Sequence, residues 1–289
     1  MDRSVADVIR QRYSCRTYLD TPIEADQRHI LEEFLASLGT APLGSGARIA
    51  LVAATAQDRE SLKGLGTYGV IKGATGFLVG AAQSGPKDLE DFGYQMERAV
   101  LRATDLGLAT CWLGGSFSKS NFARKIGATR NERVPAVAAI GHAAEGSKAT
   151  DRIRQRAGSS ARLPSEQLFF HDRFGEPLTI DAAGAYAGVL ELVRWAPSAS
   201  NKQPWRIVRG TDGWHFYLQR SKGYGKGTLV FTLMRVADLQ RVDMGIAMCH
   251  FEMAARATGL AGNWAVRDPG LAIPAEGVEY TVSWLETTG

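Results

Sequence analysis

Residues 91–112 read DFGYQMERAVLRATDLGLATCW, and residues 243–264 read DMGIAMCHFEMAARATGLAGNW. The two stretches align without a gap at an offset of 152 residues and share eight of 22 positions, where composition alone gives roughly two. The identical pairs are Asp91/Asp243, Gly93/Gly245, Met96/Met248, Ala103/Ala255, Gly107/Gly259, Leu108/Leu260, Ala109/Ala261 and Trp112/Trp264. Each copy is typical of a long helix that ends at Gly-Leu-Ala and leads to a tryptophan.

A second correspondence lies upstream of each long helix. Ala41-Pro42 follows one predicted helix and precedes Arg48-Ile49, while Ala196-Pro197 follows another and precedes Arg206-Ile207. The first of these linkers is three residues shorter than the second. We interpret the chain as one ancestral unit present twice, and the alternative is two unrelated helices rich in alanine and glycine.

Small residues recur along one side of each long helix and predict how the two copies meet. They are Gly93, Ala99, Ala103 and Gly107 in the first copy and Gly245, Ala255 and Gly259 in the second. Small side chains let helix backbones approach closely. We therefore expect each long helix to pack against its own repeat, as in a dimer interface.

The hydrophobic periodicity indicates an α+β fold. Helices are predicted over 2–10, from 21 to 38, and over 91–108, 181–194 and 243–258, with Ser4 and Asp7 as a capping box at the first. Strands are predicted over 49–54, 76–82, 134–141, 205–209, 214–218 and 278–285. The elements mix without strict βα alternation, which disfavours a doubly wound sheet.

Composition is that of an ordinary globular protein. The 289 residues carry a formal net charge of +4, 45% are hydrophobic, and the three cysteines stand far apart. No leader or membrane-spanning stretch is evident, so we expect a cytoplasmic protein without a membrane partner. The densest basic patch, Arg152, Arg154, Arg156 and Arg162, has few aromatic neighbours, which disfavours nucleic-acid binding and fits a solvated segment or a phosphate-bearing small ligand.

Common catalytic and nucleotide motifs are weak or missing. Residues 64–69 match GxGxxG, but they follow a polar, helix-like stretch and precede a strand-like one, the reverse of a dinucleotide-binding turn. The five histidines have no ligand spacing, and no serine or cysteine pattern indicates a nucleophile. We therefore predict no metal and no catalytic side chain.

Two segments do carry a chemical signal. In Arg12-Tyr13-Ser14-Cys15-Arg16, two guanidinium groups and a hydroxyl can converge on an anion or an electron-rich ring edge. Residues 195–205 read WAPSASNKQPW and place short hydrogen-bonding side chains in a stiff loop between prolines.

Together these segments resemble the FMN-dependent nitroreductase family. Its R-x-S-x-R/K pattern is similar to Arg12/Ser14/Arg16, and its P-S-x-x-N-x-Q-P-W pattern is matched in full by residues 197–205. In the usual member one subunit of a homodimer supplies the first pattern and its partner supplies the second. Here they are split between the two repeats, which resembles the tandem branch of the family. The resemblance implies a pseudo-dimer of two halves, 1–165 and 166–289, that forms one compact unit and keeps one of two sites.

The resemblance also implies which residues hold FMN. Arg16 is expected near the pyrimidine edge of the flavin, where its charge would raise the reduction potential of the flavin. Lys72 is expected at the same edge. Arg-x-Pro at Arg162 corresponds to the family's phosphate-binding arginine, and the loop 113–115 to the one that passes over the flavin. The full expected set is Arg12, Tyr13, Ser14, Arg16, Lys72, Leu113, Gly114, Gly115, Arg162, Pro197, Ser198, Ala199, Ser200, Asn201 and Gln203.

The activity implied is an FMN-dependent NAD(P)H oxidoreductase that reduces nitroaromatic or quinone-like small molecules through the bound flavin. A monomer is compatible with an intrachain pseudo-dimer. Two alternatives stay open. One keeps fold and FMN but changes the reaction, to dehalogenation or dehydrogenation, and the other is a flavin-binding protein without efficient turnover.

Overall fold

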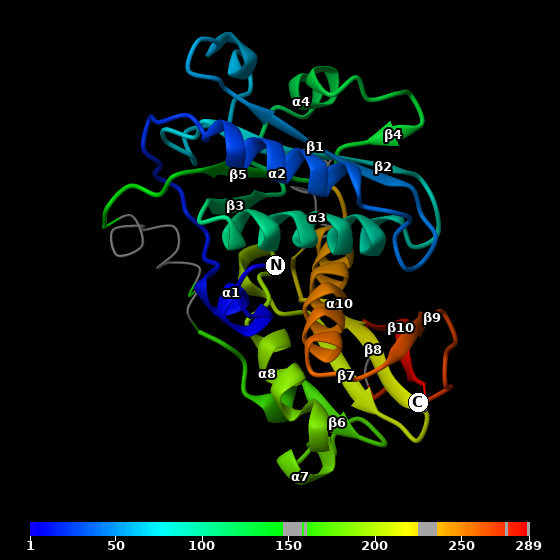
Figure 1. The fold of residues 1–289 in the computed structure, drawn as a ribbon. Coiled ribbons are helices and arrows are strands. Elements are labelled where there is room, and N and C mark those ends of the chain that lie inside the picture. The colour runs from blue at the N-terminus through cyan, green and yellow to red at the C-terminus, as the bar shows by residue number, and fades with distance from the viewer. Residues whose placement is uncertain (147–157, 159–160, 225–235, 275–276, 288–289) are drawn as a thin grey trace.

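A computed structural model describes residues 1–146, 158, 161–224, 236–274 and 277–287. Arg152, Arg154 and Arg156 of the basic patch lie outside the described residues. Figure 1 shows two sheets, one above and one below, with the long helices α3 and α10 between them. The chain thus has the predicted α+β architecture of two halves.

The first half consists of a five-stranded sheet with helices around it. The strand order is β1-β2-β5-β3, and β4 pairs with β2; all these pairs are antiparallel. The elements are α1 (Val5–Gln11), α2 (Ala25–Ala36), β1 (Ala47–Ala53), η1 (Glu60–Leu62), β2 (Gly76–Gln83), α3 (Asp88–Asp105), β3 (Ala109–Leu113), α4 (Lys119–Lys125), β4 (Glu132–Arg133) and β5 (Val137–Gly141).

The second half has a sheet in the order β6-β7-β8-β10-β9, in which β6 runs parallel to β7. Its elements are η2 (Ser165–Gln167), β6 (Phe169–His171), α7 (Ile180–Ala183), η3 (Gly184–Tyr186), α8 (Ala187–Arg194), η4 (Ala199–Asn201), β7 (Trp205–Arg209), β8 (Gly213–Gln219), α10 (Leu239–Ala257), β9 (Gly262–Ala265) and β10 (Val278–Glu286).

Four strands of each sheet share one topology, as the repeat predicts, whereas β4 and the parallel strand β6 have no counterpart among the described residues of the other half. Among the four shared strands, two adjacent ones come first, then the long helix, then a short edge strand and a central strand. The order β1-β2-β5-β3 in the first half corresponds strand for strand to β7-β8-β10-β9 in the second. The short strands β3 and β9, which were not predicted, begin at or directly after the alanine of each Gly-Leu-Ala.

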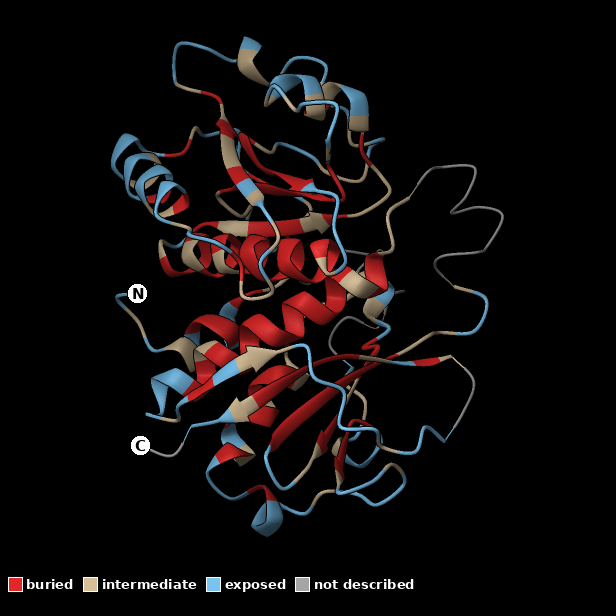
Figure 2. Cartoon of the chain, turned by 90° about the vertical axis from the view of Figure 1, so that its right-hand side faces the viewer, coloured by how far each residue is buried: buried red, intermediate tan, exposed pale blue. Residues whose placement is uncertain are grey.

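Helices α3 and α10 pack against each other at a pair of equivalent glycines. A Cβ atom on Gly93 would lie 2.1 Å from the Val242 carbonyl oxygen, and one on Gly245 would lie 1.9 Å from the Glu90 carbonyl oxygen. Only glycine permits this backbone approach. The prediction that each long helix packs on its own repeat is therefore confirmed, and both helices are buried over most of their length (Figure 2).

Two of the small residues serve a different purpose from the one predicted. Gly107 and Gly259 have φ of 83° and 78°, and no heavy atom outside their chain neighbours lies within 4 Å of an added Cβ. Each follows the end of its helix, where Leu108 N donates to Ala103 O and Leu260 N donates to Ala255 O, both at 2.9 Å. These glycines end the helices in the left-handed conformation and do not mediate helix packing.

Helix α4 (Lys119–Lys125) was not predicted, and the other predicted helices differ from the observed ones only near their ends, with one exception. The Ser4 side chain caps α1 by accepting from Asp7 N, as predicted. The helix predicted over 181–194 is interrupted, because Gly184 has φ of 54° and separates α7 from a 3₁₀ turn and α8. Residues 64–69 follow a 3₁₀ turn and are not preceded by a strand, which is inconsistent with a dinucleotide-binding turn.

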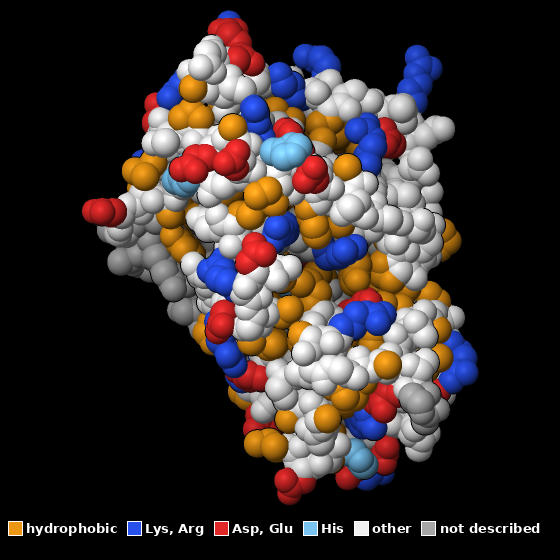
Figure 3. All heavy atoms as spheres, in the orientation of Figure 1, with side chains coloured by type: hydrophobic (Ala, Val, Ile, Leu, Met, Phe, Trp, Pro, Cys, Tyr) orange, Lys and Arg blue, Asp and Glu red, His pale blue; other side chains and the backbone are white. Residues whose placement is uncertain are grey.

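Charged side chains of both signs are interspersed over the face of the molecule in Figure 3. On this face the basic side chains do not form one continuous patch. Among the described residues, no helix combines the length and apolar character needed to cross a membrane.

Candidate functional site

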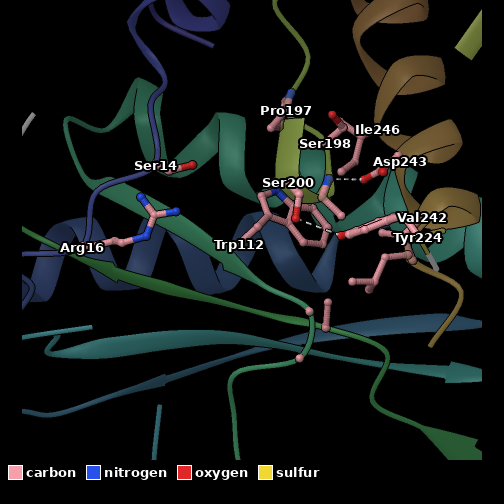
Figure 4. A pocket seen from close by; sticks show the side chains of 15 residues that line it. Ser14, Arg16, Trp112, Pro197, Ser198, Ser200, Tyr224, Val242, Asp243 and Ile246 are labelled. Atoms are coloured by element: carbon pink, nitrogen blue, oxygen red, sulfur yellow. Dashed lines mark hydrogen bonds between the residues drawn. The ribbon is translucent and has the colours of Figure 1, made fainter. Parts of the chain in front are cut away.

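A cavity of about 230 Å³ lies where the two halves meet. Figure 4 shows Ser14 and Arg16 on one side of it, and Ser200, Tyr224 and Asp243 on the other. Eight of the fifteen expected residues line this cavity: Ser14, Arg16, Gly114, Gly115, Pro197, Ser198, Ala199 and Ser200. The structure thus brings the 12–16 segment of the first half together with the 197–200 loop of the second half.

An extended segment after α1 positions Ser14 and Arg16. Cys15 N donates to Thr110 O of β3 at 2.9 Å, and Lys72 N donates to Arg16 O at 2.9 Å. Side chains alternate along an extended chain. Cys15 therefore enters the core of the first half, while its neighbours on either side line the cavity.

The glycine loop after β3 forms another wall. A Cβ atom on Gly114 would lie 2.4 Å from Leu239 Cδ1, at the start of α10, whereas one on Gly115 would meet its nearest neighbour at 3.5 Å. Gly114 thus allows the backbone of the first half to contact the second half directly. Trp112 precedes the loop, lines the cavity, and donates from its indole nitrogen to Glu97 at 2.7 Å.

The loop at 197–203 is held in an unusual backbone conformation. Ser200, Asn201 and Gln203 all have φ near +50°, a region that costs non-glycine residues free energy and is often found at functional sites. Hydrogen bonds within the loop stabilise this conformation: Gln203 N donates to Ser198 Oγ at 2.9 Å, and Gln203 Nε2 donates to Asn201 O at 3.2 Å.

The loop is also anchored to α10. Ala199 N donates to Asp243 Oδ1 at 2.9 Å. In the first half, the equivalent aspartate anchors the equivalent loop, because Asp91 accepts from Leu43 N at 2.9 Å and from Ser45 N at 2.7 Å. The repeated pair Asp91/Asp243 thus has the same structural role in both halves, with two amide donors in one half and one in the other.

Three expected residues, Arg162 and the loop residues Asn201 and Gln203, do not line the cavity wall. Arg162 Nη1 donates to Asn201 Oδ1 at 3.3 Å, and Asn201 Nδ2 donates to Ala161 O at 3.0 Å. Gln203 Oε1 accepts from Leu163 N at 2.9 Å. These contacts join the Arg-x-Pro segment to the loop and place Arg162 beside it.

The remaining expected residues lie outside the cavity wall in different ways. Arg12 is buried, with its Nε 4.0 Å from a carboxylate oxygen of Glu97. Leu113 belongs to the core of the first half, and Tyr13 lines a separate small hollow. Lys72 is exposed, and its backbone N–H donates to Arg16 O, as described above.

Sequence reasoning missed most of the α10 contribution. The cavity is also lined by Ala136, Tyr224, Leu239, Val242, Asp243 and Ile246. Tyr224 OH lies 3.1 Å from Ser200 Oγ. Asp243 was visible in the sequence only as a repeated residue, and its approach to the loop follows from tertiary packing. Among the described residues, no cluster of histidine, cysteine and carboxylate groups could hold a metal ion.

A second hollow lies at the position related to the cavity by the repeat. It is lined by residues 43–46, which correspond to the 198–201 loop, and by Lys87 and Val266. At the offset of 152, these two residues correspond to Leu239 and Gly114 of the cavity. The second hollow therefore has an ammonium group and a branched side chain where the cavity has an apolar wall and a glycine.

Comparison with known proteins identifies the class of this chain. A family model described as "Putative TM nitroreductase" matches residues 4–255, and the chain belongs to this family of nitroreductases. No curated protein matches the chain. The crystal structure of a "putative nitroreductase" from Thermotoga maritima MSB8 is similar over 99% of this chain and 95% of that one, with 17% identity and a TM-score of 0.61. The full-length likeness confirms the predicted nitroreductase fold of two halves.

Two further solved structures match about half of the chain. The nitroreductase with bound FMN from Bacteroides fragilis is 22% identical, covers 50% of this chain and 90% of its own, and has a TM-score of 0.39. The FMN- and NADPH-dependent nitroreductase from a Sphigopyxis strain is 15% identical, covers 50% of this chain and 91% of its own, and has a TM-score of 0.39.

Substitution of Asp91 tests the anchoring role in isolation from the cavity. In Asp91→Asn, the new amide group faces one of the two backbone N–H donors and leaves it without an acceptor. We expect a loss of about 1–3 kcal/mol in the free energy of unfolding, measured by chemical denaturation, with no change in ligand binding at the cavity. An Asp91→Asn protein as stable as wild type would contradict the anchoring role.

Proposed function

We propose that this chain is an FMN-dependent NAD(P)H oxidoreductase that reduces nitroaromatic or quinone-like small molecules and acts as a cytoplasmic monomer. The observation that carries the proposal is the single cavity in which Ser14 and Arg16 of one half meet the 197–200 loop of the other. We assign residues 1–165 and 166–289 as the two halves. Family membership supports this class of activity.

The residues of the cavity fit a flavin. Arg16 supplies a fixed positive charge, and Ser14, Ser198 and Ser200 supply hydroxyl groups that donate or accept hydrogen bonds. Leu239, Val242 and Ile246 form an apolar wall suited to a flat ring. The volume of about 230 Å³ is close to the lower end, about 300 Å³, of small-molecule sites.

When bound, FMN would supply the hydride chemistry, and the protein supplies binding and electrostatics. The guanidinium group of Arg16 stabilises negative charge on a ring edge placed against it. Gly114 and Gly115 line the cavity and have no side chains of their own, so a ring can approach their backbone closely. Lys72, Arg12 and Arg162 do not line the cavity wall but remain in the proposed binding set as positively charged groups, with the phosphate assigned to Arg162.

Anaerobic stopped-flow mixing with NADH and with NADPH tests the activity. We expect the absorbance of bound oxidised flavin to bleach with at least one of the two donors and to return when a nitroarene or a quinone is added. A protein that binds FMN but is reduced by neither donor would contradict the proposal and would favour the flavin-binding or oxidative alternatives.

A further inference from the structure

A buried carboxyl oxygen in the cavity wall has no partner in the structure. Asp243 is 2% exposed and lines the cavity. Its Oδ1 accepts from Ala199 N, whereas its Oδ2 is buried and makes no hydrogen bond with any described residue. Buried polar atoms in folded proteins nearly always have a partner, so this oxygen calls for one, either a water molecule or a group bound in the cavity.

The equivalent aspartate in the first half has no unpaired oxygen. At the equivalent aspartate, Ser45 N donates to Asp91 Oδ2, and both oxygens are used. In the second half, Ser200 occupies the loop position that corresponds to Ser45. This loop is three residues longer, and Ser200 has a left-handed backbone conformation with φ of 50°. The Asp243 side chain receives only the Ala199 N–H there. The second half therefore differs from the first in that one oxygen of its aspartate, Asp243 Oδ2, accepts no hydrogen bond from the loop.

The surroundings of Asp243 favour its uncharged form. Burial raises the pKa of Asp243 well above its usual range, the nearby carboxylate of Asp238 raises it further, and only the Ala199 amide opposes the rise. Burial also raises the pKa of Asp91, but hydrogen bonds from Ser45 and Leu43 oppose it there. A neutral carboxyl group that accepts at one oxygen has a proton to donate at the other.

The charged groups near Asp243 form ion pairs with other residues or lie on the far side of the cavity. Asp238 pairs with Arg220 at 2.7 Å, and Glu90 of α3 pairs with Arg241 at 2.6 Å. Tyr224 contacts the loop through Ser200. Arg16 lies on the opposite side of the cavity from Asp243 (Figure 4).

We propose that Asp243 is a ligand-binding residue that donates a hydrogen bond from Oδ2 to an acceptor atom, a carbonyl oxygen or an imine nitrogen, of the ring bound in the cavity. This inference rests on the proposed function, because it takes that ring to be the flavin. Arg16 and Asp243 then contribute a cation and a neutral donor from the two halves to one ring. The second hollow has no equivalent group, since both oxygens of Asp91 are occupied.

Two substitutions separate a neutral donor from a charged acceptor. Asp243→Asn keeps an oxygen for the Ala199 amide and places an N–H donor at the Oδ2 position, so FMN affinity should stay within about threefold of wild type. Asp243→Leu removes the donor, and FMN affinity should fall at least about tenfold. Dissociation constants are measured by quenching of FMN fluorescence at pH 7. If Asp243→Asn weakens binding tenfold or more, Asp243 acts as a charged acceptor and the proposal is wrong.

Infrared difference spectroscopy provides a readout that needs no turnover and does not depend on the folding of Asp243→Leu. Wild type without FMN should show the carbonyl stretch of a protonated carboxylic acid that Asp243→Asn lacks. FMN binding should shift this band, because the carboxyl group then donates a hydrogen bond. A missing band, or a band that FMN does not move, overturns the inference. If wild type fails to bind FMN at all, the proposed function itself fails, which distinguishes the two.

Discussion

Gly245→Ala is expected to lower the free energy of unfolding by about 3 kcal/mol or more, because a Cβ there would lie 1.9 Å from Glu90 O and 2.7 Å from Tyr94 N. The atoms in the way belong to the backbone of α3, so the clash can be relieved only by moving the two long helices apart. Those helices join the two halves, and the cavity lies where the halves meet. We expect the variant to lose FMN binding together with stability.

The matched control is Gly188→Ala in α8. Apart from the chain neighbours and the backbone of its own helix, no heavy atom lies within 4 Å of an added Cβ at Gly188, and its φ is not in the left-handed region. Alanine in a helix is favoured over glycine by about 0.5–1 kcal/mol, so this variant should be as stable as wild type or slightly more so. Chemical denaturation monitored by circular dichroism measures both variants. Equal stability of the two would contradict the helix contact as described.

Arg16→Ala is expected to weaken FMN binding at least about tenfold and to lower the reduction potential of the bound flavin. A hydrogen bond to a charged group is worth about 1.5–3 kcal/mol, which accounts for the loss of affinity. The substitution also removes a positive charge from one side of the cavity, so a reduced, negatively charged ring is less stable there. Fluorescence titration gives the dissociation constant, and a dye-coupled redox titration gives the potential.

Arg48→Ala serves as the control for Arg16→Ala. Arg48 lies on β1 and donates to both oxygens of Glu132, at 2.8 and 3.1 Å, and this pair lowers the pKa of Glu132 to about 2. Its side chain is 45% exposed and does not line the cavity. Removal should cost about 1 kcal/mol of stability at most and leave FMN binding unchanged. If both variants weaken binding equally, the charged edge of the site has been placed wrongly.

The sequence predicted the architecture well, because the fold depends on a repeated pattern. Identity at Gly93/Gly245 indicated helix contact, and the structure confirms it. The same reasoning was wrong for Gly107 and Gly259, since a glycine that ends a helix and one that permits packing look alike in a sequence. The interruption at Gly184 was missed, because an apolar helical spacing continues across it.

The candidate site was predictable where short motifs carry it. Ser14, Arg16 and the 197–200 loop meet at one cavity although about 180 residues separate them in the chain. Asp243 could not be identified in this way, since its repeat partner Asp91 has the same residue type and only anchors a loop. The difference between them lies in the number of amides that reach each carboxyl group, which is a property of the folded backbone.

Native mass spectrometry of the purified protein tests the central claim that one complete site is built from both halves of a single chain. The second hollow has Lys87 and Val266 where the cavity has Leu239 and Gly114, and the R-x-S-x-R pattern is present only once. We predict a species of one 31.2 kDa chain with one FMN. A chain that carries two FMN molecules, or one that binds FMN only as a dimer, would contradict the account.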